Sequence, residues 1–310
     1  MNDTVFVETK EHRLFHEFCD ACKKYRYIGL CYGPPGVGKT LSARYYAHWD
    51  QIEPYTSTKH AAAVNQQDVL PADVLFYTVP VVNTPNQIRN DLHALRNALH
   101  DLVLDDLYRE REARIAAVYE RERQEADSPL RAGSWYRTSN GADLRRTEAL
   151  EQIHDEFRPL FEARPDPTRL VLVDETDRLK IATLEQLRAV FDVGDISLVL
   201  IGMLGLEKRL ARYPQLYSRV GFVHQFRPLA AQEVRELLRR QWSPPGTDLP
   251  EEGIADEEAV ASVLRITGGN FRLLARLLTQ IARVLEVNEA DEVTVAIVEA
   301  ARESLVIGAA

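Results

Sequence analysis

The octapeptide GPPGVGKT, residues 33–40, constrains the fold more than any other segment of this chain. It satisfies the pattern G-x-x-x-x-G-K-[ST] and lies between an apolar run, 27–32, and a segment with helical character, 41–49. Its glycines allow the backbone to wrap closely around phosphate groups, and the start of the following helix points N–H groups at an anion. The octapeptide therefore predicts a phosphate-binding loop in an α/β fold.

The residues of this loop have distinct expected roles in binding ATP. Lys39 should reach the β and γ phosphates, and the Thr40 hydroxyl should ligate Mg²⁺. The alternative, a glycine and proline turn that binds no ligand, does not explain why the loop lies between a strand and a helix. The other residues expected to bind the nucleotide lie within or next to the loop: Gly33, Pro34, Pro35, Gly36, Val37, Gly38 and Leu41.

A second motif, LVLVDETD at residues 170–177, supplies carboxylates. Its apolar run is typical of a buried strand, and ligands bind at the carboxyl ends of strands in open α/β sheets. Asp174 should hold Mg²⁺ through water, and Glu175 should orient or deprotonate the attacking water. An acidic pair after a strand can also cap the next helix, but the phosphate loop favours a catalytic role. We therefore expect Glu175, Asp174 and Lys39 to be catalytic residues.

Apolar periodicity along the rest of the chain indicates an α/β fold with an all-helical end. We expect a parallel sheet flanked by helices in residues 1–228, followed by a small helical lid in residues 229–310. A charged, arginine-rich helical stretch at about 105–166 looks like an insertion into the first domain. The predicted elements are strands at 27–32, 74–82, 169–174, 196–201 and 221–226, and helices at 11–26, from Pro85 onward, and at 256–266, 271–287 and 293–304.

Hydropathy and charge limit the partners of this chain. No segment approaches about 18 uncharged apolar residues, and the N-terminus MNDTVFVETKEHRLF lacks the basic-then-apolar order of a signal peptide. We therefore expect a cytoplasmic protein with no membrane partner. The formal net charge of -9 argues against a surface that is basic all over. A local basic patch stays possible, because salt limits the reach of each charge to about 10 Å at ~0.1 M.

Four residues near the N-terminus have side chains that can bind metals. His12, His16, Cys19 and Cys22 recur at helical spacing, which suits either a zinc cluster or one packed face of a helix. We favour the packed face, because four ligands along one straight helix cannot easily surround a tetrahedral ion. Together with Cys31 the chain has three cysteines, which cannot all pair with one another, so free thiols are expected.

Four segments give the chain a resemblance to a known family. They are YIGLCYGPPGVGKT, LVLVDETDRL, IGMLGLEKRLARYPQLYSRVGFVHQFRPL and EVTVAIVEAARESLVIG. With these the sequence resembles the AAA+ ATPases that regulate transposition, namely TniB, TnsC and the B protein of phage Mu. The resemblance runs from about Val5 to Gly308, and the stretch GLEKRLARYPQLYSR is its most specific part.

The resemblance implies roles for two arginines. Arg219 stands where AAA+ proteins place an arginine finger, a catalytic residue that completes the site of a neighbouring subunit. Arg272 resembles the second-sensor arginine that couples the lid to the nucleotide. Either residue could instead be an ordinary surface arginine. At the first-sensor position the chain departs from the family, because Gly202 and Met203 stand where a polar residue is usual.

The resemblance also implies the partners: duplex DNA, further copies of this chain in a ring or helical filament, and a transposase. The residues that the family comparison places against DNA follow the second predicted strand, and the insertion adds arginines and aromatic residues suited to backbone contact or stacking. The candidate DNA contacts are Asn83, Thr84, Arg89, Arg96, Arg131, Arg137 and Arg145, with Trp135, Tyr136 and Arg146 beside them.

Two other functions fit the same nucleotide site. One is a helicase loader or replication-initiator ATPase, and the other is a nucleotide-switched ATPase of a defence or signalling pathway that binds protein instead of DNA. Each of these candidates would keep the phosphate loop and the acidic pair, so these motifs do not distinguish them.

Overall fold

The computed structural model describes most of the chain: residues 6–57, 72–126, 139–240, 242–244, 246–247, 249, 254 and 256–305. These residues belong to two compact units. The first comprises Met1–Tyr46, Phe76–Ile88 and Leu170–Ala310, and the second comprises Ala47–Leu75 and Arg89–Arg169.

A five-stranded sheet with the strand order β2-β3-β4-β1-β5 forms the centre of the first unit's fold. Strand β1 pairs in parallel with β4 and β5, and β3 pairs in parallel with β4. Every residue of β3 and β4 is buried, as expected for parallel strands covered on both faces. The prediction of a parallel sheet is confirmed. The strands are β1 (Ile28–Tyr32), β2 (Val74–Thr78), β3 (Leu170–Asp174), β4 (Ser197–Gly202) and β5 (Val220–Gln225).

Helices of the first unit surround the sheet and connect its strands. The phosphate loop leads from β1 into α2, and the residues after Asp174 form the short turn η2. Because parallel strands end at the same edge of a sheet, the segments that follow β1, β3 and β4 meet there. The helices are α1 (Lys10–Tyr25), α2 (Lys39–Tyr46), η2 (Thr176–Arg178), α7 (Ile181–Val193), α8 (Leu206–Leu210) and α9 (Pro214–Tyr217).

Helix α1 packs one apolar face into the core. Cys19 and Cys22 are buried on that face, and burial raises the pKa of the Cys22 thiol to about 12. A thiol that holds its proton is a poor metal ligand, since metals bind the thiolate. No group of three or more ligand-type side chains in the described part of the chain is placed to hold a metal ion. The burial of Cys19 and Cys22 agrees with the packed-face interpretation of α1.

Four helices form the C-terminal part of the first unit: α10 (Ala231–Arg239), α11 (Glu257–Thr267), α12 (Phe271–Asn288) and α13 (Val295–Glu303). The three helices predicted from periodicity in this region are confirmed as α11, α12 and α13. Their apolar faces share one hydrophobic core, to which α12 contributes the most buried side chains. Asp256, Asn270 and Thr294 cap the starts of α11, α12 and α13, respectively.

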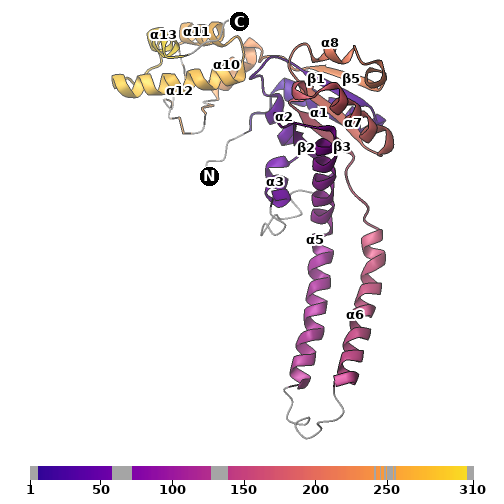
Figure 1. The fold of residues 1–310 in the computed structure, drawn as a ribbon. Helices are drawn as coiled ribbons and strands as arrows, with labels where there is room; N and C mark the ends of the chain where they lie inside the picture. Colours follow the sequence, from indigo (N-terminus) through magenta and orange to yellow (C-terminus); the bar gives the residue numbers. More distant parts are fainter. Residues whose placement is uncertain are drawn as a thin grey trace. The chain divides into compact units, whose positions relative to one another are not determined.

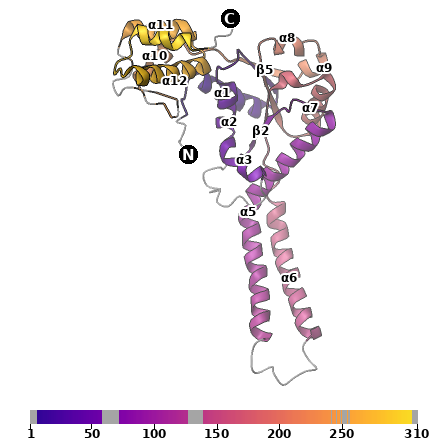
Figure 2. The ribbon, with the colours of Figure 1, turned by 60° about the vertical axis from the view of Figure 1, so that its left-hand side comes forward.

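The second unit contains α3 (Trp49–Ser57), α6 (Ser139–Glu162) and all but the first turn of α5 (Pro85–Ala126). Helices α5 and α6 run side by side and antiparallel, as Figures 1 and 2 show. Their shared core is small, consisting of Leu104, Leu107, Ile153 and Phe157. Helix α5 continues unbroken through residue 105, the expected start of the insertion, because no glycine or proline interrupts it there. No helix among the described residues is both long enough and apolar enough to cross a membrane.

Candidate nucleotide-binding site

The glycines of the phosphate loop are required by its shape. Gly36 and Gly38 have φ angles of 79° and 107°, a region that favours glycine. A Cβ atom on Gly33 would lie 2.2 Å from the carbonyl oxygen of Phe226. A Cβ on Gly36 would lie 2.6 Å from the Oδ1 atom of Asn270. The loop therefore passes closer to its neighbours than any residue with a side chain allows.

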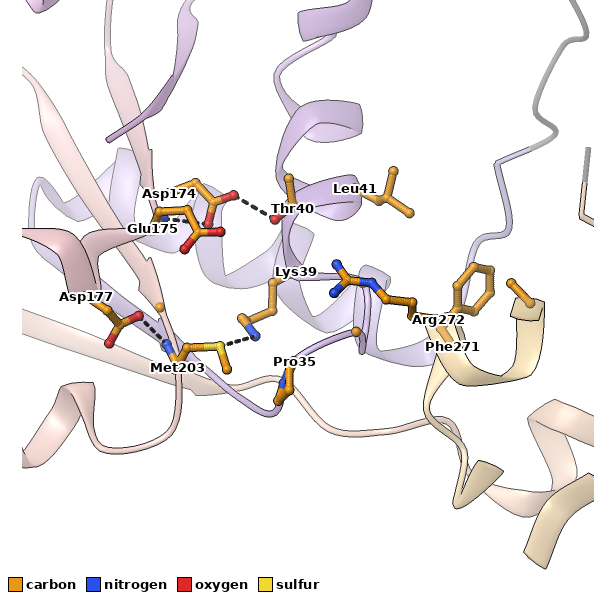
Figure 3. A pocket seen from close by; sticks show the side chains of 14 residues that line it. Pro35, Lys39, Thr40, Leu41, Asp174, Glu175, Asp177, Met203, Phe271 and Arg272 are labelled. Carbon is orange, nitrogen blue, oxygen red and sulfur yellow. Dashed lines mark hydrogen bonds between the residues drawn. The ribbon is translucent and has the colours of Figure 1, made fainter. Parts of the chain in front are cut away.

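Lys39 supplies a buried cation at the start of α2, with 8% of its surface exposed. Its Nζ donates to the carbonyl oxygens of Gly33 at 2.9 Å and Pro34 at 2.7 Å, and lies 4.0 Å from the Sδ atom of Met203 (Figure 3). Burial lowers the pKa of Lys39, and nearby acidic groups, Asp174 among them, oppose that shift. The Lys39 ammonium group therefore lies in the loop and donates to two carbonyl oxygens, which other acceptors can replace.

Asp174 and Thr40 place oxygen atoms together on the other side of the cavity. The Thr40 hydroxyl donates to Oδ2 of Asp174 at 2.6 Å, and the backbone N–H of Glu175 donates to Oδ1 at 2.8 Å. A hydroxyl and a carboxylate are the ligand types that Mg²⁺ takes in nucleotide sites, so these residues fit the ion. Glu175 has a φ of 56°, and its carboxylate lies 3.8 Å from a guanidinium nitrogen of Arg178.

The start of α12 closes the cavity from the lid side. The backbone N–H of Arg272 donates to the Gly36 carbonyl at 2.9 Å, and Nδ2 of Asn270 donates to the Pro35 carbonyl at 2.7 Å. Figure 3 shows the Arg272 side chain extending from α12 toward Lys39 and Thr40. The cavity has a volume of about 320 Å³, and its lining combines loop, acidic-pair and lid residues.

Sequence reasoning missed several residues that line this cavity: Asp177, Phe271 and Ala275. Asp177 accepts the backbone N–H of Met203 at 2.7 Å, and a Cβ on Gly202 would lie 2.5 Å from the same carboxylate oxygen. Gly202 thus leaves room for Asp177, which brings a polar group to the end of β4 where the usual polar sensor is missing. Gly202 was noted from the sequence, but its contact with Asp177 could not be predicted from it.

Comparisons with known proteins agree with this geometry. The family model described as an AAA domain matches residues 22–210. The chain belongs to the AAA domain family. A potential ATP-binding protein of Staphylococcus aureus is 39% identical to it over 307 residues, which are 98% of this chain and 97% of that protein.

Solved structures similar to this AAA-domain protein include RuvB from Thermotoga maritima, described as a Holliday junction branch migration motor. It is 17% identical with a TM-score of 0.50, and the match covers 97% of this chain and 70% of that one. A mutant of the same RuvB is 18% identical, also with a TM-score of 0.50, covering 98% and 71%. At these identities the likeness supports the fold alone.

Arg219, expected as the arginine finger, is not among the residues that line the cavity of this AAA-domain protein. It lies directly before β5, and its guanidinium pairs with the Asp192 carboxylate on α7. The stretch before it is fixed by packing and by hydrogen bonds. Leu206, Leu210 and Leu216 are buried, and Arg209 donates to the backbone carbonyl of Asp177 at 2.8 Å.

Two of the candidate DNA contacts in the first unit have structural partners. Asn83 donates to the carbonyls of Pro80 at 3.1 Å and Arg178 at 3.3 Å. The Thr84 hydroxyl accepts the backbone N–H of Gln87 at 3.2 Å, as a cap of α5 does. Both side chains therefore shape the loop after β2.

The candidates in the second unit differ from one another. Arg96 binds the Asp166 carboxylate through Nε at 2.8 Å and through NH2 at 2.7 Å, so its charge is neutralised within the chain. Arg89 and Arg145 are exposed. Arg146 pairs with the Glu122 carboxylate at 3.3 Å. The other candidates lie outside the described residues: Arg131, Trp135, Tyr136 and Arg137.

Proposed function

We propose that this AAA-domain protein is a Mg²⁺-dependent ATPase whose substrate binds in the cavity between the phosphate loop and the start of α12. The observation that supports this most is that Lys39, Thr40, Asp174 and Glu175 line one cavity. Thr40 and Asp174 are 134 positions apart in sequence and still share a hydrogen bond. A glycine-rich turn that binds no ligand would not need to lie against the buried, acidic end of β3.

We assign different residues of the cavity to phosphate binding, Mg²⁺ binding and activation of the attacking water. Lys39 exchanges its two carbonyl acceptors for oxygens of the β and γ phosphates. Thr40 and Asp174 hold Mg²⁺, which when bound neutralises phosphate charge. Glu175 orients the attacking water or accepts its proton. Leu41 and Phe271, which line the outer part of the cavity, offer apolar surface to the base.

Two arginines complete the proposed site. Arg272 couples the lid to the nucleotide, since its backbone is bonded to the loop and its side chain extends into the cavity. Arg219 supplies positive charge to the nucleotide of a neighbouring subunit, where such charge stabilises the transferring phosphoryl group. We divide the chain accordingly into a nucleotide-binding domain, 1–228, and a helical lid, 229–310.

We extend the proposal to an oligomeric, ATP-dependent DNA-binding protein that marks target DNA and recruits or activates a transposase. The resemblance of residues 205–219 to transposition regulators supports this step. The solved RuvB structure is described as a motor for Holliday junctions, so a fold of this kind acts on DNA in that protein. A helicase loader or a nucleotide-switched signalling ATPase are the alternatives, and pull-down with a replicative helicase or a lack of DNA binding would favour them.

Two substitutions test the nucleotide site. Lys39→Ala should abolish tight ATP binding in calorimetry, because it removes the cation aimed at the phosphates. Glu175→Gln should still bind ATP while turnover falls by roughly 10² or more, the scale of a lost general base. Unchanged ATP affinity in the first variant, or parental turnover in the second, would refute these roles.

Electron microscopy with duplex DNA and a slowly hydrolysed ATP analogue tests the wider proposal. Rings or filaments on DNA that require the analogue are expected. Adding the product of an adjacent transposase gene should then give a complex that depends on both DNA and nucleotide. A parent protein that hydrolyses ATP but never binds duplex DNA would refute the transposition role and leave the ATPase assignment intact.

A further inference from the structure

All three nitrogens of the Arg219 guanidinium donate hydrogen bonds within its own subunit. Its Nε donates to Oδ1 of Asp192 at 2.5 Å, and NH2 donates to Oδ2 of the same carboxylate at 2.9 Å. NH1 donates to the carbonyl of Gln215 and lies 3.4 Å from the hydroxyl of Ser218. A two-pronged pairing of this kind is also how arginine binds phosphate. Asp192 therefore occupies the same donors that a phosphate would use.

Asp192 has a second cationic partner on its own helix. NH1 of Arg188 donates to Oδ2 of Asp192 at 2.6 Å, and Nε of Arg188 donates to Oε2 of Glu185 at 2.7 Å. The hydrogen bond from Arg219 is the main reason that the pKa of Asp192 is lowered, and Arg188 adds to it. Arg188 therefore remains a partner of the carboxylate when Arg219 leaves.

We propose that Asp192 is a positioning residue that holds Arg219 within its own subunit and competes with the phosphate of a neighbouring nucleotide for the guanidinium. The proposal rests on the finger role of Arg219 given above. Binding of a neighbouring subunit then requires an exchange of partners: Arg219 leaves Asp192 for the phosphate, and Arg188 retains the carboxylate.

Exposure and charge make this exchange feasible. The side chains of Arg219 and Asp192 are 31% and 29% exposed, so water and salt screen their pairing. A pair of this kind is strong enough to orient the guanidinium and weak enough to be displaced by a phosphate that carries more than one negative charge. Arg188 lowers the free-energy cost of releasing Arg219 from Asp192. Without Arg188, the Asp192 carboxylate would lose its close cationic partner when Arg219 leaves.

Two substitutions on α7 should act in opposite directions. Asp192→Asn keeps the shape of the side chain but removes its charge, which frees Arg219. Arg188→Ala leaves Arg219 as the cation paired with Asp192 in the described part of the chain, so release becomes harder. A matched control is Asp195→Asn, which makes the same charge change nearby, at a carboxylate that pairs with Arg26 at 2.6 Å.

The measurement is ATP turnover per subunit as a function of protein concentration, with binding of a fluorescent ATP analogue measured in parallel. For Asp192→Asn we expect the concentration at half-maximal turnover to fall about fivefold, the scale of a partly exposed ion pair. Arg188→Ala should raise that concentration by a similar factor, and Asp195→Asn should match the parent. Nucleotide binding should be unchanged in all three, and high salt should reduce the differences.

Other results would overturn the proposal. Shifts of Asp192→Asn and Asp195→Asn by the same amount would indicate a general charge effect, and a shift of both α7 variants in one direction would indicate helix damage. A lower maximal turnover of Asp192→Asn at saturating protein would mean that the assembled state needs the carboxylate. Arg219→Ala distinguishes the finger role of Arg219 from the competition by Asp192. If it has parental turnover, the finger role itself fails; if it is inactive while neither α7 variant shifts, only the competition by Asp192 fails.

Discussion

Replacing Asn270 by Asp separates two roles that this side chain performs. Its Oδ1 accepts the backbone N–H of Leu273 at 3.1 Å and caps α12, while its Nδ2 donates to the Pro35 carbonyl at 2.7 Å. A carboxylate keeps the cap, since Asp and Asn are equally good at that position. It has no donor for the Pro35 carbonyl, however. The variant thus breaks a bond between lid helix and phosphate loop and leaves the first turn of α12 intact.

The size of the effect follows from that one bond. A net hydrogen bond contributes about 1 kcal/mol, which corresponds to about fivefold in affinity. The added negative charge beside the phosphates increases the loss. We therefore expect Asn270→Asp to raise the dissociation constant for ATP, measured by calorimetry, by about fivefold or more. Because this bond also forms without nucleotide, the melting temperature of the nucleotide-free protein should fall by about 2–4 °C.

Thr294→Ala is the matched control. The Thr294 hydroxyl accepts the backbone N–H of Ile297 at 3.4 Å at the start of α13, a cap that does not contact the phosphate loop. Its loss should cost about 1 kcal/mol of stability and leave ATP affinity unchanged. The reasoning is refuted if Asn270→Asp binds ATP as tightly as the parent, or if Thr294→Ala weakens binding equally.

Three further predictions use other parts of the structure. Arg219→Ala and Glu175→Gln subunits, each inactive alone, should regain some turnover when mixed and shown to co-assemble, because some interfaces then carry both groups; no recovery at any ratio would contradict a finger that acts on a neighbour. Burial, with a smaller contribution from Arg227, lowers the pKa of His224 from 6.5 to about 4, while the Glu11 carboxylate 3.6 Å from its Nε2 acts in the opposite direction, so the folded state binds fewer protons and loses stability as pH falls from 6.5 to 4. His224→Phe should flatten that part of the profile in chemical denaturation at pH 7 and pH 5, and an unchanged slope would show that another group is responsible. Arg89→Ala should weaken DNA binding and its salt dependence, whereas Arg96→Ala should mainly destabilise the second unit because it leaves Asp166 unpaired; equal losses of DNA affinity without loss of stability would contradict this distinction.

The sequence predicts which motifs line the candidate site where the pattern is local. The loop at 33–40 and the acidic pair after β3 are each encoded within a few consecutive residues, and their position at the carboxyl edge of a parallel sheet follows from strand direction. The strand order could not be predicted in the same way. The register that pairs β1 with both β4 and β5 depends on contacts between segments far apart in the chain.

The candidate residues with distant partners were harder to interpret. Arg96 was expected to contact phosphate because the family resemblance places its segment against DNA, but Asp166, 70 positions away, binds it. Asp177 was passed over because its function depends on the space left by Gly202 and on the N–H of Met203, 26 positions away. In both cases the deciding partner lies on another element, which periodicity and motif spacing do not reveal.

Two residues at the start of α12 tie the lid to the phosphate loop, and Gly269 packs within the lid beside them. A Cβ on Gly269 would lie 2.0 Å from the carbonyl oxygen of Leu229, and the backbone N–H of Leu229 donates to the Gly269 carbonyl at 2.8 Å. Asn270, the next residue, contacts Pro35. Arg272, two positions further along the chain, contacts Gly36. Because Asn270 and Arg272 are two positions apart, α12 cannot move away from the phosphate loop and keep only one of these two bonds. If Arg272 binds the nucleotide as proposed, we expect any opening of the lid to break both bonds and withdraw Arg272 together, which would couple lid position to nucleotide binding.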